Sequence, residues 1–184
     1  PGCVDTLCKP FTIYDTANIS VCSPRYGNRW IFGAGAMLDF SAEPPISSGP
    51  VAGFNSNESS TSMSDRCGNL LFYSNAATVY DGNYQGMPNG TGLIGAGTTT
   101  NGVRIIPVPG SENRYYLFTL TEVLQNGVND GCYYHIIDMN LRGNGTALQP
   151  RGDVLLKNQV LQKTADYNTT LSEKTTVIRH ANGV

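Results

Sequence analysis

Short apolar runs separated by turn-forming residues make up most of the chain. No window of a dozen residues keeps the i, i+3, i+4, i+7 apolar spacing of an amphipathic helix without Gly or Pro. Aromatic, aliphatic and β-branched residues instead gather in short runs that follow Gly, Asp or Pro turns, as strands do. The runs are residues 29–32, 68–73, 102–108, 114–119, 132–138, 153–156 and 174–179. This pattern predicts an all-β protein with closely spaced hairpins.

An aromatic pair after a polar turn recurs along the sequence at intervals of 42 to 43 residues. The pairs are Trp30 with Phe32, Phe72 with Tyr73, and Tyr115 with Tyr116. This interval is the length of a four-stranded propeller blade, and fewer than four intervals fit between residue 29 and residue 184. We therefore expect a β-propeller-like fold of about three to four blades of four-stranded antiparallel sheet, belonging to a larger propeller. The aromatic residues expected in the sheet cores are Trp30, Phe32, Phe72, Tyr116 and Phe118.

Composition divides the chain into a short leader and one larger domain. Residues 1–27 are interpreted as a leader strand or the end of a preceding module, and residues 28–184 as a partial β-propeller domain. The stretches 39–64 and 81–102 are rich in Ser, Pro, Asn and Gly, which predicts long loops. Residues that bind a ligand or partner would lie in such loops.

The last apolar run, residues 174–179, has no obvious hairpin mate in the chain. An unpaired strand exposes N–H and C=O groups that recruit another strand. Residues 160–184 are therefore expected to pair, through an open blade edge, with further sequence of the same protein or with another chain.

Several sequence blocks, taken in order, carry a resemblance to a known family. They are residues 28–33, 68–73, 87–93, 105–110, 115–119 and 180–183. Together they resemble the N-terminal propeller-like region of large secreted Bacteroidetes proteins, which typically end in a gliding-motility-associated, type IX secretion sorting domain. The resemblance covers residues 28–184. It implies export across the outer membrane, display or release at the cell surface, and a scaffold or adhesive role with protein or glycan contacts.

The same resemblance implies modification of the exported chain. Thr6 and Thr16 lie in Asp-Thr-aliphatic triplets similar to the O-glycan attachment sites of such bacteria. Asn-x-Ser/Thr triplets also suggest a glycoprotein, although a chain this rich in Asn and Thr contains them by chance. No catalytic residues come with the resemblance.

The charge pattern argues against two classes of partner. Charged residues make up 14% of the chain, the net charge is −2, and the basic residues are scattered singly. A nucleic-acid interface needs a basic stripe, so nucleic acid is not expected as a partner. No apolar stretch approaches the roughly 18 residues of a membrane span, so direct membrane insertion is not expected.

The cysteine spacing favours disulfides over a metal site. The five cysteines are Cys3, Cys8, Cys22, Cys67 and Cys132. Zinc sites commonly contain a Cys-x-x-Cys pair, and these five cysteines form none. An oxidising compartment with at least one disulfide among the five is therefore expected, and Cys3 with Cys8 is the most local pairing.

Four further residues are assigned structural roles. Asp65 and Gly68 are expected in an Asx turn that closes a hairpin, because an Asp carboxylate accepts turn N–H groups. His180 lies in a block shared with the family and is expected to orient neighbouring loops. His135 lies between Tyr134 and Ile136 in a strand pattern and is interpreted as a packed or half-exposed strand residue rather than a base.

Calcium is the one cofactor for which the sequence offers candidate ligands. Asp81 with Asn83, and Asn129 with Asp130, form oxygen-rich turns, but neither has the Asp-x-Asp-x-Asp-Gly cadence of a dedicated site. Solvated turns are the favoured interpretation. The tripeptide at residues 151–153, Arg-Gly-Asp, is likewise explained as a turn before a strand.

No catalytic constellation emerges from these patterns. The favoured function is a non-enzymatic exported scaffold or adhesin-like segment without metal or cofactor. The alternative is a carbohydrate-binding or carbohydrate-active propeller, either a lectin or a glycosidase. A glycosidase needs two facing carboxylates, and the sequence alone does not pair any.

Overall fold

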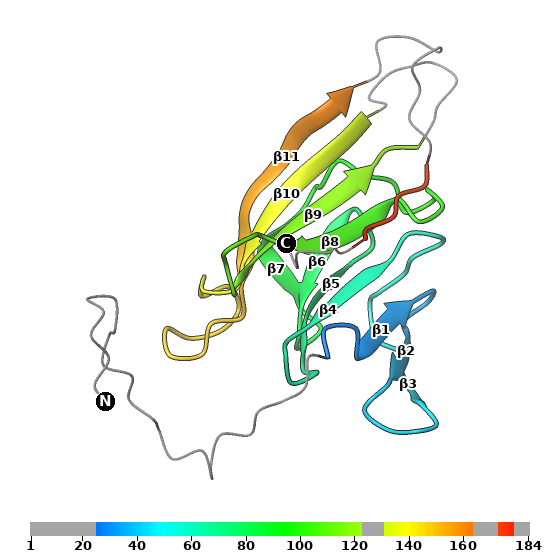
Figure 1. Ribbon diagram of the computed structural model, residues 1–184, viewed down its shortest axis with the longest axis vertical. Coiled ribbons are helices and arrows are strands. Elements are labelled where there is room, and N and C mark those ends of the chain that lie inside the picture. The colour runs from blue at the N-terminus through cyan, green and yellow to red at the C-terminus, as the bar shows by residue number, and fades with distance from the viewer. Residues whose placement is uncertain (1–24, 123–130, 164–172, 179–184) are drawn as a thin grey trace, which may run out of the picture.

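The computed structural model describes residues 25–122, 131–163 and 173–178, which form eleven strands and no helix. The all-β prediction is confirmed for this part of the chain (Figure 1). The strands are β1 (Arg29–Phe32), β2 (Ala36–Asp39), β3 (Ile46–Ser48), β4 (Thr61–Ser64), β5 (Leu70–Ser74), β6 (Thr78–Asp81), β7 (Gly86–Thr91), β8 (Val103–Pro107), β9 (Arg114–Leu120), β10 (Gly131–Asp138) and β11 (Asp153–Lys163).

The strands form three antiparallel sheets, each of which follows the chain in order. The first sheet contains β1-β2-β3, the second β4-β5-β6-β7, and the third β8-β9-β10-β11. The first strands of successive sheets are neighbours, because β1 contacts β4 and β4 contacts β8. At the opposite side of the second and third sheets, β7 contacts β11.

The β4–β5 hairpin is closed by the expected Asx turn. The Asp65 carboxylate accepts the backbone N–H groups of Cys67 at 2.8 Å and Asn69 at 2.9 Å. Gly68 adopts a left-handed φ of 92°, which glycine tolerates without steric cost. The turn predicted at Asp65 and Gly68 is therefore present.

The β6–β7 hairpin repeats this geometry with different residues. The Asp81 carboxylate accepts the N–H groups of Asn83 at 2.8 Å and Gln85 at 3.1 Å. Tyr84, with φ of 67°, occupies the position that Gly68 fills in the first hairpin. In both hairpins an Asp carboxylate accepts the N–H groups of the residues two and four positions after it.

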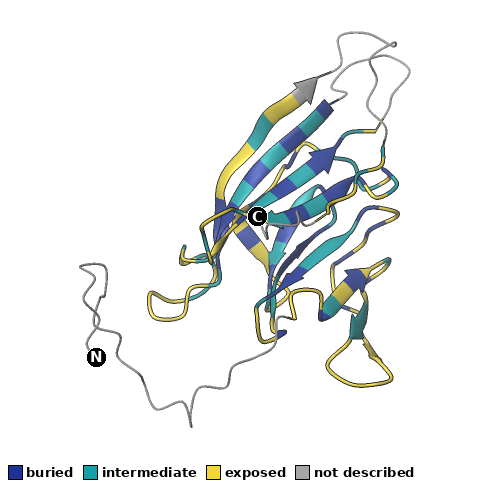
Figure 2. Ribbon diagram, in the orientation of Figure 1, coloured by how far each residue is buried: buried dark blue, intermediate teal, exposed yellow. Residues whose placement is uncertain are grey.

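Two apolar clusters hold the sheets together. The larger lies between the second and third sheets and contains Met63, Phe72, Ala76, Val79, Met87, Leu93, Val103, Ile105, Tyr115, Leu117, Ile137 and Val154. The smaller lies between the first and second sheets and contains Ile31, Val51, Phe54 and Tyr73. Buried positions alternate with half-buried or exposed ones along β8, β9 and β10, as strands with one covered face require (Figure 2).

The aromatic core prediction is partly wrong. Phe72 is fully buried, but Trp30 is 52% exposed and Phe32 is 39% exposed. Tyr116 and Phe118 are half-buried. Because side chains alternate along a strand, Ile31 takes the inward position in β1, and Tyr115 and Leu117 take it in β9.

Two predicted long loops contain strands. Residues 39–64 include β3 and β4, and residues 81–102 include β7. These strands are short and rich in Ser, Thr, Gly and Asn, so they lack the apolar run on which the prediction depended. Beyond them, β11 extends from Asp153 to Lys163, well past the predicted residues 153–156.

The strand predicted at residues 174–179 is also wrong where the structure describes it. Residues 173–178 form no strand and run beside β8 (Figure 1). Thr175 attaches this segment by donating its N–H (3.3 Å) and Oγ1–H (2.9 Å) to the carbonyl of Asn101.

Candidate functional site

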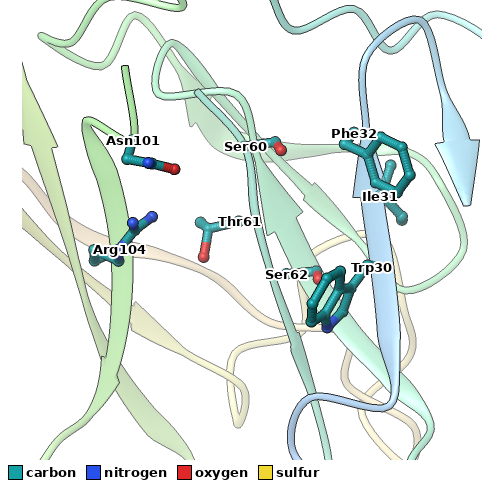
Figure 3. A pocket seen from close by; sticks show the side chains of 8 residues that line it. All are labelled: Trp30, Ile31, Phe32, Ser60, Thr61, Ser62, Asn101 and Arg104. Atoms are coloured by element: carbon teal, nitrogen blue, oxygen red, sulfur yellow. The ribbon is translucent and has the colours of Figure 1, made fainter. Parts of the chain in front are cut away.

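A groove of about 430 Å³ crosses the first strands of the three sheets (Figure 3). Its walls come from β1, from the start of β4, and from the segment that leads into β8. The lining residues are Trp30, Ile31, Phe32, Ser60, Thr61, Ser62, Asn101 and Arg104. A volume of this size lies within the range of small-molecule sites, which is about 300–1,000 Å³.

The β1 wall presents aromatic surface to the groove. Trp30 and Phe32 are exposed because the intervening Ile31 faces the core. Trp30 packs against Phe40 with ring centroids 5.0 Å apart, so the indole is supported from within the first sheet. The wall is therefore apolar, exposed and fixed in place.

The base of the β1–β2 hairpin is held by polar contacts around Asp39. Its carboxylate accepts the N–H of Ser41 at 2.8 Å and the amide of Asn28 at 3.2 Å, and it pairs with Arg29 at 3.3 Å. The bond from Ser41, followed by the Arg29 charge, outweighs burial and lowers the pKa of Asp39. Asp39 stays ionised and stabilises the strand that carries Trp30.

The opposite wall is polar. Thr61 and Ser62 bring hydroxyl groups from β4, and the Ser62 hydroxyl donates to the carbonyl of Arg29 at 2.6 Å, which ties β4 to β1. Asn101 brings a side-chain amide and holds a left-handed φ of 59°. These groups can both donate and accept hydrogen bonds.

Arg104 supplies the charge in the groove lining. Its Nη1 donates to the carbonyl of Val103 at 2.8 Å. The ion pairs within the described ranges are Arg29 with Asp39 and Arg114 with Asp138, so neither gives Arg104 a carboxylate partner. The groove therefore combines aromatic surface, neutral polar groups and a positive charge.

His135 lies in β10, away from the groove lining, and is fully buried. Its Nδ1 accepts the N–H of Asn158 at 3.0 Å, which leaves the proton on Nε2, 2.9 Å from Thr119 Oγ1. Thr119 in turn donates to the carbonyl of Ile94. Burial, followed by the charge of Lys157, lowers the pKa of His135 to about 4. His135 is a neutral packed residue, as the strand pattern predicted.

Polar clamps join β11 to β7 and the loop after it. Asp153 accepts both the backbone N–H (2.9 Å) and the side-chain amide (2.8 Å) of Asn89. Lys157 donates to the carbonyl of Thr91 at 2.9 Å. Asp153 is 8% exposed, so the Arg-Gly-Asp turn does not present its carboxylate to a ligand.

The calcium candidate at Asp81 and Asn83 is held by hydrogen-bond donors. Beyond the two turn N–H groups, the Asp81 carboxylate accepts the side-chain amide of Asn144 at 3.0 Å. With its amide oxygen facing Arg151, Asn83 accepts that guanidinium at 2.6 Å and 2.8 Å. In the part of the chain that the structure describes, no three His, Cys, Asp or Glu side chains come together as a metal site. Asn129 and Asp130 lie outside the described residues.

Two of the five cysteines are described. Cys67 is disulfide-bonded. Cys132 is a free, half-buried thiol whose pKa is raised by burial, so its candidacy for a disulfide is not supported. The remaining candidates, Cys3, Cys8 and Cys22 for disulfides, Thr6 and Thr16 for O-glycans, and His180 for the turn, lie outside the described residues.

The groove was not predicted from the sequence. Its polar wall lies in or beside stretches that were predicted to be loops. The aromatic residues of its other wall, Trp30 and Phe32, were predicted to lie in the core. The alternation around Ile31 is the signal that could have indicated the exposed side of β1.

The chain matches no protein-family model, no curated protein and no solved structure. Within the described ranges there is no helix of the length and apolar character that crossing a membrane requires. The groove must therefore be interpreted from its own chemistry.

Proposed function

We propose that the three sheets are consecutive blades of a β-propeller-like domain within a larger propeller. Two kinds of contact support this arrangement. The first strands β1, β4 and β8 follow one another, as innermost strands do around a propeller axis. The last strands β7 and β11 are also neighbours, as outer strands are.

We further propose that this domain is a non-enzymatic binding scaffold. The observation that carries the proposal is the groove across β1, β4 and β8, where Trp30 and Phe32 face hydroxyl and amide groups. Propellers bind ligands where their innermost strands and connecting loops converge. We propose that this scaffold acts at the cell surface or in the secreted fraction, with surface proteins or glycans as partners, as the resemblance of residues 28–184 to exported Bacteroidetes proteins implies.

Further blades would cover the third sheet. Tyr116, Phe118, Tyr134 and Ile136 lie on the face of that sheet opposite the shared core and are half-buried. The edge strand β11 adds exposed apolar residues, among them Val160 at 55%. Such surface supports pairing through residues 160–184 with further sequence of the same protein or another chain.

Binding to arrays of glycans and of cell-surface proteins tests the scaffold function. Trp30→Ala should weaken binding at least about tenfold, a cost of about 1.4 kcal/mol, if the groove holds the ligand. Leu148→Ala removes another exposed side chain, 94% exposed and outside the groove lining, and should leave binding unchanged. Equal binding by both variants would remove the groove from the function.

The alternative of a carbohydrate-active enzyme is tested with the same ligands. A glycosidase would hydrolyse a bound oligosaccharide, and substitution of one catalytic carboxylate would abolish the turnover. A scaffold returns every bound oligosaccharide intact, which mass spectrometry of the ligand measures.

A further inference from the structure

The groove lining fits a particular class of ligand because of what its polar groups can do. The side chains of Thr61 and Asn101 offer acceptors as well as donors, and Ser62, which donates its proton to the carbonyl of Arg29, offers an acceptor. A sugar hydroxyl also donates and accepts, whereas phosphate and carboxylate groups only accept. The neutral part of the groove is thus matched to a sugar.

The aromatic wall fits the same ligand. Trp30 has about half of its surface open, and its contact with Phe40 holds the ring in one orientation. The face of an aromatic ring carries negative partial charge, which attracts the partly positive C–H groups on the flat side of a pyranose ring. An exposed, supported indole therefore offers a stacking surface for one sugar unit.

Arg104 adds a requirement for negative charge. It lines the groove together with Trp30, and its backbone bond at Nη1 leaves further guanidinium N–H groups for a ligand. Arginine forms paired, charge-assisted hydrogen bonds with a carboxylate. No Asp or Glu is among the lining residues that the structure describes.

We propose that the groove binds an acidic oligosaccharide, with a sugar carboxylate on Arg104 and a neighbouring ring stacked on Trp30. This inference rests on the proposed scaffold function and names its ligand class. A peptide of Asp and Glu would satisfy Arg104 but has no ring to stack on Trp30. The sugar is therefore the favoured source of the carboxylate.

Calorimetric titration of the full chain with matched oligosaccharides tests this proposal. The probes are tetramers of galacturonate, glucuronate and mannuronate, each paired with the same tetramer after reduction of its carboxylates to alcohols. At least one acidic tetramer should bind about tenfold or more tightly than its reduced counterpart, since a charge-assisted hydrogen bond contributes about 1.5–3 kcal/mol. Arg104→Gln should remove this preference.

The control is Arg142→Gln, which makes the same charge change in the β10–β11 loop and should retain the preference. Chemical denaturation of each variant verifies that it is folded. Equal affinity for acidic and reduced tetramers, with no effect of Arg104→Gln, would overturn the acidic class and leave the scaffold function standing. Tetraglutamate binding as tightly as the best acidic tetramer would overturn the choice of a sugar. Absence of binding to every tetramer would overturn this proposal, while the surface-protein arm of the scaffold test would still decide the function.

Discussion

The boundary between the second and third sheets differs sharply from the outer side of the first sheet. Twelve buried residues fill the former, and polar clamps from Asp153 and Lys157 close its edge. A four-residue cluster holds the first sheet to the second, and the opposite face of β1 leaves Trp30 and Phe32 exposed. Asp153 and Lys157, which close the edge between the second and third sheets, are hydrogen-bonded within the chain. The lining of the groove has polar groups that remain available to a ligand.

This difference separates stability from binding. A closed interface with satisfied polar groups contributes to folding, since buried polar groups stabilise only when they are hydrogen-bonded. An exposed aromatic pair beside an arginine contributes less to folding and suits the contact role proposed for the groove. The second and third sheets are then the stable body, and the first sheet supplies one wall of the site.

The largest expected effect comes from removing one aromatic side chain on each side of this comparison. Phe72→Ala should lower the free energy of unfolding by about 3–5 kcal/mol, because Phe72 is fully buried in the larger cluster. Trp30→Ala should lower it by less, about 1–2 kcal/mol, because about half of the Trp30 surface is exposed. Urea denaturation of the two variants measures both values. Losses of similar size would mean that the first sheet belongs to the stable body.

Stability should also fall in mild acid because of His135. Its pKa is about 4 in the folded chain, against an ordinary value of 6.5. The unfolded chain therefore binds a proton below pH 6.5 that the folded chain rejects until near pH 4, so stability present above pH 6.5 is lost across that window. The expected loss between pH 7 and pH 5 is about 2 kcal/mol.

His135→Gln isolates this effect, because a glutamine amide can also donate and accept but does not titrate. Its free energy of unfolding should change little between pH 7 and pH 5, whereas that of the natural chain falls. Asp39 and Asp138 have lowered pKa values and lose their contributions only in stronger acid, below the window used. Parallel pH profiles for the variant and the natural chain would show that His135 is not the source.

The clamp between β7 and β11 should have a measurable coupling energy. Asp153 accepts two hydrogen bonds from Asn89, one from the backbone and one from the side chain. A double-mutant cycle of Asp153→Ala and Asn89→Ala removes the side-chain bond and should give about 1–2 kcal/mol of coupling, as hydrogen bonds to a charged group do. Purely additive losses would mean that the clamp does not stabilise this edge.

The sequence predicts the strands that carry a clear apolar run and misses the short polar ones. Residues 29–32 and 132–138 were assigned as strands because their apolar and β-branched side chains form a clear run, and β1 and β10 lie there. The strands β4 and β7 are short and polar, and they are extended because neighbouring strands supply their hydrogen bonds, a tertiary effect. The wrong assignment of Trp30 and Phe32 to the core has a similar cause. An aromatic run reveals a strand but does not say which of its alternating side chains face inward.

The smallest expected effect compares two ion pairs, one in each region. Arg29 and Asp39 lie 3.3 Å apart in the first sheet, and both side chains keep some exposure to solvent. Arg114 and Asp138 lie 2.7 Å apart across β9 and β10, and the Asp138 side chain is only 5% exposed.

Burial alone would raise the pKa of Asp138, but bonds from Asn140 and Arg114 outweigh it and lower that pKa. Double-mutant cycles to alanine should give about 0.5 kcal/mol for the first pair and about 1–1.5 kcal/mol for the second, because Arg114, although 52% exposed, makes a short charge-assisted hydrogen bond to a nearly buried carboxylate. Raising the salt concentration to 1 M should reduce the first coupling more than the second, since the Asp39 carboxylate is more exposed to solvent ions than that of Asp138 (17% against 5%). A stronger coupling for Arg29 and Asp39 would instead place an essential stabilising contact in the first sheet and remove the division of roles between the two regions.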